Sequence, residues 1–132
     1  MTRISTETQS YRFSFRSRLR SFRFAARGIC VFLRTTHNAW IHAMAAIAVI
    51  VAGVVFRIDR SDWLWITAAI TGVFVAEALN TAVEFLCDVV SPEFHPMVEN
   101  AKDVAAGAVL MAALGAGVIG LIVFFPHLLR LT

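Results

Sequence analysis

Charged residues are missing from two long stretches of this 132-residue sequence, and cysteine, proline and lysine are scarce throughout. Residues 39–56 and 104–125 contain no Asp, Glu, Lys or Arg. The only cysteines, Cys30 and Cys87, lie in apolar segments, so we expect no disulfide. The sequence also has no GxxxxGK[ST] motif and no Gly-rich kinase loop, which excludes the P-loop and protein-kinase ways of holding phosphate.

The residues that are present are mostly apolar. Apolar residues make up 58% of the chain and the mean hydropathy is +0.71, above the roughly 45–50% apolar content of soluble proteins. A helix needs about 20 apolar residues to cross a bilayer, and both uncharged stretches are long enough. A third apolar segment is interrupted by two glutamates. The sequence therefore predicts an all-α membrane protein with spans at about 39–57, 63–87 and 103–125.

The remaining segments predict a simple plan around the spans. Residues 1–19 are polar and basic, and we expect them to be flexible. Residues 20–34 mix arginines with large apolar side chains, which is typical of an amphipathic helix lying in the headgroup region. Residues 91–100 (SPEFHPMVEN) contain two prolines and predict a loop. We expect residues 20–127 to form a single domain.

The basic residues predict the orientation. Residues 1–38 carry eight arginines, and the second connection between spans carries Lys102. The opposite side has only three basic residues: Arg57, Arg60 and Arg130. Because basic residues stay on the cytoplasmic side, we expect the amino end and the second connection to face the cytoplasm.

Small residues recur along the third span. Four of them are spaced four residues apart: Ala108, Ala112, Ala116 and Gly120. Small side chains let helix backbones approach closely, so this face is expected to pack on another helix. The pattern favours self-association as a hypothesis, but it fits contacts within one chain equally well.

Polar residues in the second span indicate chemistry. Glu77, Asn80, Glu84 and Asp88 are separated by three, four and four residues, which places them on one helix face within roughly 80°. Glu77 is expected well inside the membrane, where a charge costs at least about 2.5–3.5 kcal/mol. The default interpretation is functional. The alternative is internal pairing that only holds helices together, for which His42 is the one basic partner in the other spans.

Lys102 and Asp103 follow at the start of the third span, and Lys102 is the only lysine in the chain. With the carboxylates nearby, this end of the protein offers ligands for a divalent cation and an ammonium group for phosphate. Phosphoryl transfer depends mostly on positioning and charge neutralisation, so the set is sufficient in outline for that chemistry.

These residues also carry a resemblance. EALNTAVEFLCDVVSPEFHP (77–96) followed by AKDVAAGAVL (101–110) resembles the small bacterial diacylglycerol kinase family, which includes diacylglycerol kinases and undecaprenol kinases. The resemblance covers about residues 21–125, and SPEFHP and AKDVAAGAV are more similar to the undecaprenol kinase branch. It implies a homotrimeric kinase of the bacterial inner membrane that uses ATP and Mg²⁺ to phosphorylate a lipid hydroxyl, with no nucleic-acid partner.

The resemblance also implies roles for individual residues. Glu77 is the general base, which the residues support independently because burial makes a carboxylate a better proton acceptor. Glu84 is the implied Mg²⁺ ligand, and Asn80 beside it orients metal or nucleotide phosphate. Arg27 and His42 are assigned to the lipid substrate. The nucleotide is assigned to four further residues: Asp88, Glu93, Lys102 and Asp103.

One position departs from the family pattern. The family usually has a metal-binding glutamate at the end of the surface helix, and Thr36 stands there instead. A hydroxyl carries no charge, and the neighbouring His37 is a poor Mg²⁺ partner. The departure predicts a weakened metal site, with Glu84, Asn80, ATP phosphates and water as the remaining ligands.

Three functions stay open at this point. A kinase that prefers undecaprenol is the first interpretation, and a diacylglycerol kinase that makes phosphatidic acid is the second. A non-enzymatic trimer, either a cation pathway or an inactive relative, is the alternative from another class. A cation pathway accounts for the acidic stripe but not for Lys102 and Asp103 at the same end.

Overall fold

The computed structural model describes residues 15–129, which form four helices and no strand. They are α1 (Phe15–Thr35), α2 (His37–Phe56), α3 (Arg60–Val90) and α4 (Pro96–Leu129). The last three are long and apolar enough to cross a membrane. The predicted all-α architecture with three spans is therefore confirmed.

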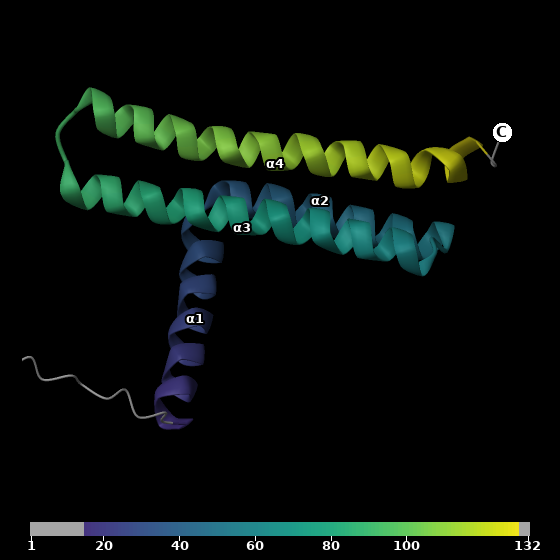
Figure 1. Cartoon of the computed structure of the whole chain (residues 1–132), viewed down its shortest axis with the longest axis horizontal. Coiled ribbons are helices and arrows are strands. Elements are labelled where there is room, and N and C mark those ends of the chain that lie inside the picture. Colours follow the sequence, from purple (N-terminus) through teal and green to yellow (C-terminus); the bar gives the residue numbers. More distant parts are fainter. Residues whose placement is uncertain (1–14, 130–132) are drawn as a thin grey trace, which may run out of the picture.

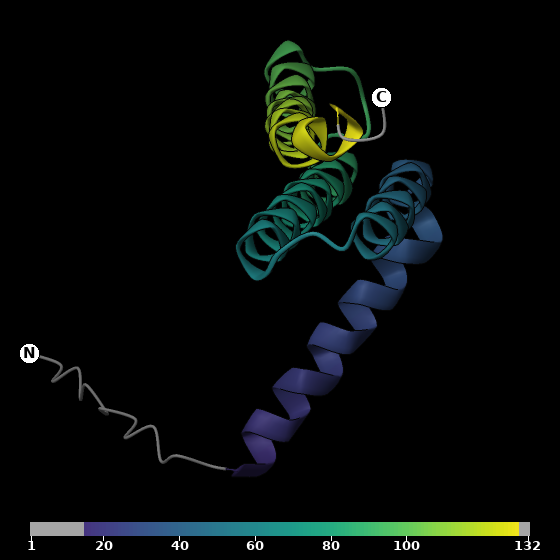
Figure 2. The ribbon, with the colours of Figure 1, turned by 90° about the vertical axis from the view of Figure 1, so that its right-hand side faces the viewer.

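Helix α3 is the centre of the bundle (Figure 1). Helix α4 runs antiparallel along it, and α2 packs against another side of α3. Helix α1 leaves the bundle steeply at the start of α2, as Figure 2 shows from the side. We refer to the end that carries α1 and the connection 91–95 as the α1 end. The opposite end, at the turn 57–59 between α2 and α3, is the hairpin end.

The turn at the hairpin end is closed by local hydrogen bonds. Arg57 has a left-handed backbone (φ 51°), and its N–H donates to the Val54 carbonyl at 3.2 Å. Asp59 then caps α3, because its Oδ1 accepts the Asp62 N–H at 2.9 Å. A carboxylate at this position satisfies an N–H that the helix itself leaves unpaired. The two spans are therefore joined by only three residues.

All four helices begin before their predicted bounds, and the differences are largest for α4 and α1. Helix α4 starts at Pro96, so the expected loop 91–100 is reduced to residues 91–95. Proline is favoured in the first turn because its fixed φ suits a helix and its missing N–H is not needed there. The Met97 N–H donates to His95 Nδ1 at 3.2 Å, which caps the helix. Helix α1 starts at Phe15, so the last part of the expected flexible segment is helical; residues 1–14 lie outside the described residues.

The helices differ in length, and this determines where the polar residues of α3 lie along the bundle relative to α2. At 1.5 Å per residue α2 is about 30 Å long, whereas α3 and α4 are about 46 and 51 Å. At the hairpin end, the last turn of α2 lies beside the last turns of α4, because the Phe56 ring lies 6.0 Å from that of Phe124 and 6.1 Å from that of His127. The surplus of α3 and α4 therefore projects beyond the start of α2 (Figure 1).

The unequal helix lengths set the position of Glu77 relative to α2. Glu77 lies 17 residues after Arg60, or about 26 Å along α3, which is level with the first turn of α2. A helix the length of α2 just spans the hydrocarbon, which is about 30 Å thick. Glu77 therefore lies near the α1 end of the segment over which all three apolar helices run together.

Candidate functional site

One face of α3 carries a gradient of burial toward the α1 end. Glu77 is fully buried, and Asn80 and Thr81 are 6% and 4% exposed. Glu84 is half-buried and Asp88 is exposed. The face predicted from the spacing of these residues therefore runs from the interior of the bundle to its surface.

The buried part of this face has unsatisfied oxygen atoms. The Asn80 amide donates from Nδ2 to Glu84 Oε1 at 3.0 Å. Within the described residues, both carboxylate oxygens of Glu77 and the Asn80 Oδ1 are buried without a hydrogen-bond partner. Buried polar atoms are nearly always paired in native proteins, so three such atoms within one turn indicate a place prepared for a ligand or a reaction.

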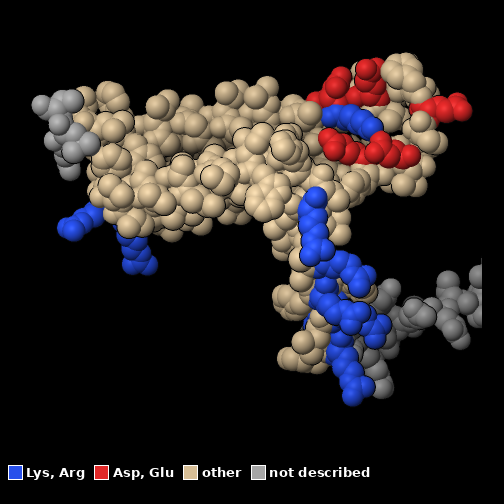
Figure 3. Space-filling view, turned by 180° about the vertical axis from the view of Figure 1, so that it is seen from behind, with Lys and Arg blue, Asp and Glu red and all other residues tan. Residues whose placement is uncertain are grey.

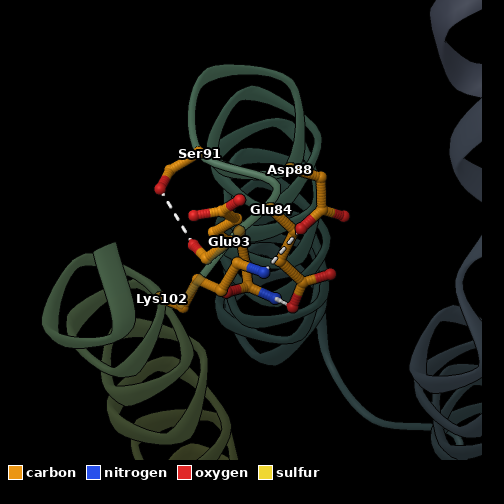
Figure 4. A network of polar contacts seen from close by, with 6 residues as sticks. Glu84, Asp88, Ser91, Glu93 and Lys102 are labelled. Carbon is orange, nitrogen blue, oxygen red and sulfur yellow. Dashed lines mark hydrogen bonds and ion pairs between the residues drawn. The ribbon is translucent and has the colours of Figure 1, made fainter. Parts of the chain in front are cut away.

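The exposed part of the face meets the start of α4. Lys102 Nζ donates to Asp88 Oδ1 at 2.6 Å, and both side chains are accessible to solvent. Figure 4 shows Glu84 and Glu93 beside this ion pair at the connection between α3 and α4. An exposed ion pair contributes little to stability and exchanges partners readily. Lys102 is therefore available to an anion that binds at this end.

The charge distribution separates the site from α1. Figure 3 shows acidic side chains gathered around one basic side chain at the α1 end of the bundle, whereas most of the basic side chains in view follow α1. Helix α1 has no acidic residue, and Arg34 lies in its last turn. The site thus combines an acidic surface with a single ammonium group.

The other predicted nucleotide residues lie at the same end but form fewer contacts. Glu93 lies in the connection, where its carbonyl accepts the Ser91 hydroxyl at 2.9 Å and its side chain is exposed. Asp103 is exposed and adjacent to Lys102. The structure therefore brings Asp88, Glu93, Lys102 and Asp103 to one end of the molecule, and joins only Asp88 and Lys102 directly.

The two residues predicted for the lipid substrate lie in different grooves. Arg27 lines a groove of about 520 Å³ between α1 and α3, together with Phe24, Gly28 and Thr81. His42 lines another groove, of about 510 Å³, among α2, α3 and α4. The α1–α3 groove is mostly apolar with one cation, which suits a lipid chain with a polar end. The structure does not bring Arg27 and His42 into one site.

Thr36 has a contact that the sequence reasoning missed. It occupies the N-cap position of α2, but its side chain makes no cap hydrogen bond. Its Oγ1 lies 3.0 Å from Thr81 Oγ1 on α3, and the Thr81 hydroxyl donates to the Glu77 carbonyl at 3.0 Å. Thr81 is four residues after Glu77, so its place on the same face was the available signal.

The donor atoms at this end fit a hard cation bound together with phosphate. Within residues 15–129, no three His, Cys, Asp or Glu side chains are placed to hold a metal by themselves. Glu84 and the unsatisfied Asn80 Oδ1 are oxygen ligands of the kind that Mg²⁺ takes. Mg²⁺ usually takes its remaining ligands from water and substrate phosphates, and the Lys102 ammonium is suited to phosphate.

Comparison with known proteins matches the sequence of this chain to a family. The family described as prokaryotic diacylglycerol kinase matches residues 23–124. The chain is 41% identical to the undecaprenol kinase of Bacillus subtilis (strain 168) over 109 residues, which are 83% of this chain and 89% of that protein. It is 36% identical to a diacylglycerol kinase of Synechocystis sp. over 112 residues, covering 84% of this chain and 64% of that protein. The diacylglycerol kinase of Escherichia coli (strain K12) is 29% identical over 96 residues, covering 67% and 79%.

Proposed function

The chain belongs to the prokaryotic diacylglycerol kinase family and is a lipid kinase that uses ATP, and we propose that it phosphorylates the terminal hydroxyl of undecaprenol. The observation that carries phosphate transfer to a lipid hydroxyl at this site is the Glu77 carboxylate. It is fully buried, has no hydrogen-bond partner within residues 15–129, and lies level with the first turn of α2. We place this level near the hydrocarbon boundary, where the hydroxyl of a membrane lipid resides. The exposed Lys102 is on the next helix at the same end.

Undecaprenol is the proposed substrate because of the pattern of similarity. The relative named undecaprenol kinase is aligned over 89% of its length at 41% identity. The two relatives named diacylglycerol kinase are less identical, at 36% and 29%. A mostly apolar groove accepts a prenyl or an acyl chain alike, so diacylglycerol is the alternative acceptor.

In the proposed reaction, Glu77 takes the proton of the lipid hydroxyl as the hydroxyl oxygen bonds to the γ-phosphorus of ATP. The bond from that phosphorus to the bridging oxygen breaks, and ADP leaves with the electron pair. Lys102 exchanges Asp88 for the ATP phosphates and holds them near the surface. Glu84 and Asn80 would hold Mg²⁺, which when bound would neutralise phosphate charge. Positioning and neutralisation of this kind supply most of the catalysis in phosphoryl transfer.

The remaining nucleotide contacts are proposed at the connection between α3 and α4. Asp88, Glu93 and Asp103 lie at the same end as Lys102, and their exposure makes them accessible to a soluble nucleotide. Arg27 is proposed to contact the polar end of the lipid from the α1–α3 groove. His42 faces a separate groove, and we assign it a weaker part in the substrate site.

We further propose a homotrimer in the bacterial inner membrane, with the α1 end in the cytoplasm. The groove among α2, α3 and α4 supports self-association, because small residues of α4 line it: Ala113, Ala116, Gly117 and Gly120. Small residues permit close approach of a helix from a second copy. The concentration of arginines before α2 supports the orientation.

The proposal is tested by phosphate transfer from labelled ATP, with Mg²⁺, to undecaprenol and to diacylglycerol in parallel. We expect faster transfer to undecaprenol than to diacylglycerol, and transfer lowered by about 10²- to 10⁴-fold in Glu77→Gln. Preference for diacylglycerol would assign the alternative acceptor. A folded, oligomeric wild-type protein that transfers phosphate to neither lipid would contradict the proposal and favour a cation pathway, for which ion flux into vesicles is the direct assay.

A further inference from the structure

We propose that Thr36 and Thr81 form a hydroxyl bridge that positions Glu77, and that Thr36 serves the reaction through this bridge instead of as a metal ligand. The inference rests on the proposed role of Glu77 as the base. It concerns Thr36, where the family resemblance leads to the expectation of a metal-binding glutamate. Thr36 and Thr81 are positioning residues in this scheme, because they act through Glu77.

The hydrogen bonds of the bridge have a defined direction. The Thr81 hydroxyl donates to the Glu77 carbonyl at 3.0 Å. A hydroxyl has only one proton to donate, so in the contact of 3.0 Å between the two hydroxyl oxygens Thr36 is the donor and Thr81 the acceptor. The chain of bonds therefore runs from Thr36 through Thr81 to the backbone of Glu77.

Thr36 is placed to connect three helices. It is the single residue between α1 and α2 and has an extended backbone (φ −102°, ψ 112°). Its N–H donates to the Phe32 carbonyl at 3.1 Å, which closes the end of α1. The hydroxyl of a threonine at an N-cap ordinarily accepts a hydrogen bond from a backbone N–H of its own helix. Here the hydroxyl crosses to α3 instead, and ties the corner between α1 and α2 to that helix.

The corner between α1 and α2 contacts α3 on both sides of Glu77. Phe32, at the end of α1, is 8% exposed and makes an edge contact with Phe74, with ring centroids 6.4 Å apart. Phe74 lies three residues before Glu77, and Thr81 lies four residues after it. Two contacts from one corner thus bracket the turn of α3 that carries the proposed base.

The bridge matters because, within residues 15–129, no directed bond holds the Glu77 side chain itself, and the bridge acts on the backbone that carries it. Both of its carboxylate oxygens lack hydrogen-bond partners within the described residues. The direction of this carboxylate is therefore set by packing and by the backbone that carries it. A threonine bonded to the carbonyl four residues earlier also bends a helix slightly. A displacement of about 1 Å at a reacting group is enough to slow a reaction up to about a hundredfold.

The experiment compares variants that remove or keep single hydroxyls. Thr36→Val and Thr81→Val preserve shape and delete the bridge, and Thr36→Ser keeps the hydroxyl. Thr35→Val is the matched control, because the neighbouring Thr35 hydroxyl bonds to the Val31 carbonyl within α1 at 2.9 Å. Each protein is assayed for kcat, for KM of ATP and for the Mg²⁺ concentration at half-maximal rate.

We expect Thr36→Val and Thr81→Val each to lower kcat about five- to tenfold, with the KM for ATP and the Mg²⁺ half-saturation unchanged. Thr36→Ser and Thr35→Val should retain nearly the wild-type kcat. The double variant should be no slower than either single variant, because both delete the same bridge. A shift of the Mg²⁺ half-saturation in Thr36→Val, or tighter Mg²⁺ and faster turnover in Thr36→Glu, would overturn the proposal in favour of a ligand role.

A second measurement is independent of turnover. Thermal unfolding of the four proteins of the Thr36/Thr81 cycle, without ATP and Mg²⁺, should give non-additive shifts of Tm. Additive shifts would mean that the hydroxyls do not interact and would overturn the bridge. Activity retained in Glu77→Gln would instead refute the proposed base, and the Tm cycle would still decide whether the bridge exists.

Discussion

The hairpin end and the α1 end of the bundle are packed in different ways. At the hairpin end, Ile58, Ile66 and Val123 form an apolar cluster, surrounded by aromatic rings from α2, α3 and α4. At the α1 end, the most buried side chains of α3 are polar: Glu77, Asn80 and Thr81. The first set consists of buried apolar side chains, whereas within residues 15–129 the second set contains three buried oxygens without a hydrogen-bond partner.

The difference separates what holds this protein together from what it does. In a membrane, helices associate through close packing and hydrogen bonds, since lipid offers no hydrophobic driving force between them. The hairpin end meets that need with tight contacts. Buried carboxylate and amide oxygens without partners oppose folding, so their retention at the α1 end points to function. Substitutions at the α1 end should therefore lower activity more than stability, and substitutions at the hairpin end should lower stability more than activity.

The largest expected effect is at the α1 end. Glu77→Gln should lower lipid phosphorylation by about 10²- to 10⁴-fold, because an amide does not accept the proton as a general base does. Tm should be unchanged or higher, since a buried charge is removed. The control is Glu99→Gln, the same substitution at an exposed residue in the first turn of α4. A large fall in Tm with Glu77→Gln would contradict this comparison, because it would show that Glu77 also stabilises the fold.

Replacing the single lysine should also affect activity more than stability. Lys102→Gln should lower kcat/KM for ATP about 10- to 100-fold through loss of a charge-assisted contact with phosphate. The exposed pair with Asp88 contributes little to folding, so Tm should change little. Arg60→Gln, at the hairpin end, removes the same charge far from the site and should leave the KM for ATP unaltered.

The hairpin end should show the reverse behaviour. A Cβ at Gly53 would lie 2.9 Å from the Trp63 ring and 3.1 Å from Ile58. Gly53→Ala should therefore destabilise the protein by about 1–3 kcal/mol through overpacking, measured by thermal unfolding, and the kcat of the folded fraction should be preserved. Gly115→Ala is the control, because nothing lies within 4 Å of a Cβ there. Equal shifts for both variants would show that Gly53 is not a close-contact position.

The smallest expected effect is at the cap of α3. Asp59→Ala should cost about 1 kcal/mol, because it removes the acceptor for the Asp62 N–H. Asp62→Ala keeps that acceptor and should cost less. Phosphorylation rates of folded protein should be equal for both variants and the wild type. A change in kcat with Asp59→Ala would indicate that the hairpin end communicates with the site.

Much of this architecture was predictable from local patterns. The uncharged runs 39–56 and 104–125 predict spans because charge in hydrocarbon is unfavourable. The spacing of Glu77, Asn80 and Glu84 predicts one face because of the 3.6-residue helical period. The start of α4 was missed, since prolines in a polar segment usually indicate a loop, and only the cap by His95 shows that Pro96 begins a helix.

By itself the sequence determined the helices, the number of spans and the face of α3 that carries the acidic residues, because hydropathy and helical period are local properties. Only the tertiary structure decided that Glu77 lies level with the first turn of α2, which follows from the unequal lengths of α2 and α3. It also decided the contact of Thr36 with Thr81, 45 residues away, and the pairing of Lys102 with Asp88. These arrangements depend on how one helix packs against another, and no local pattern encodes that.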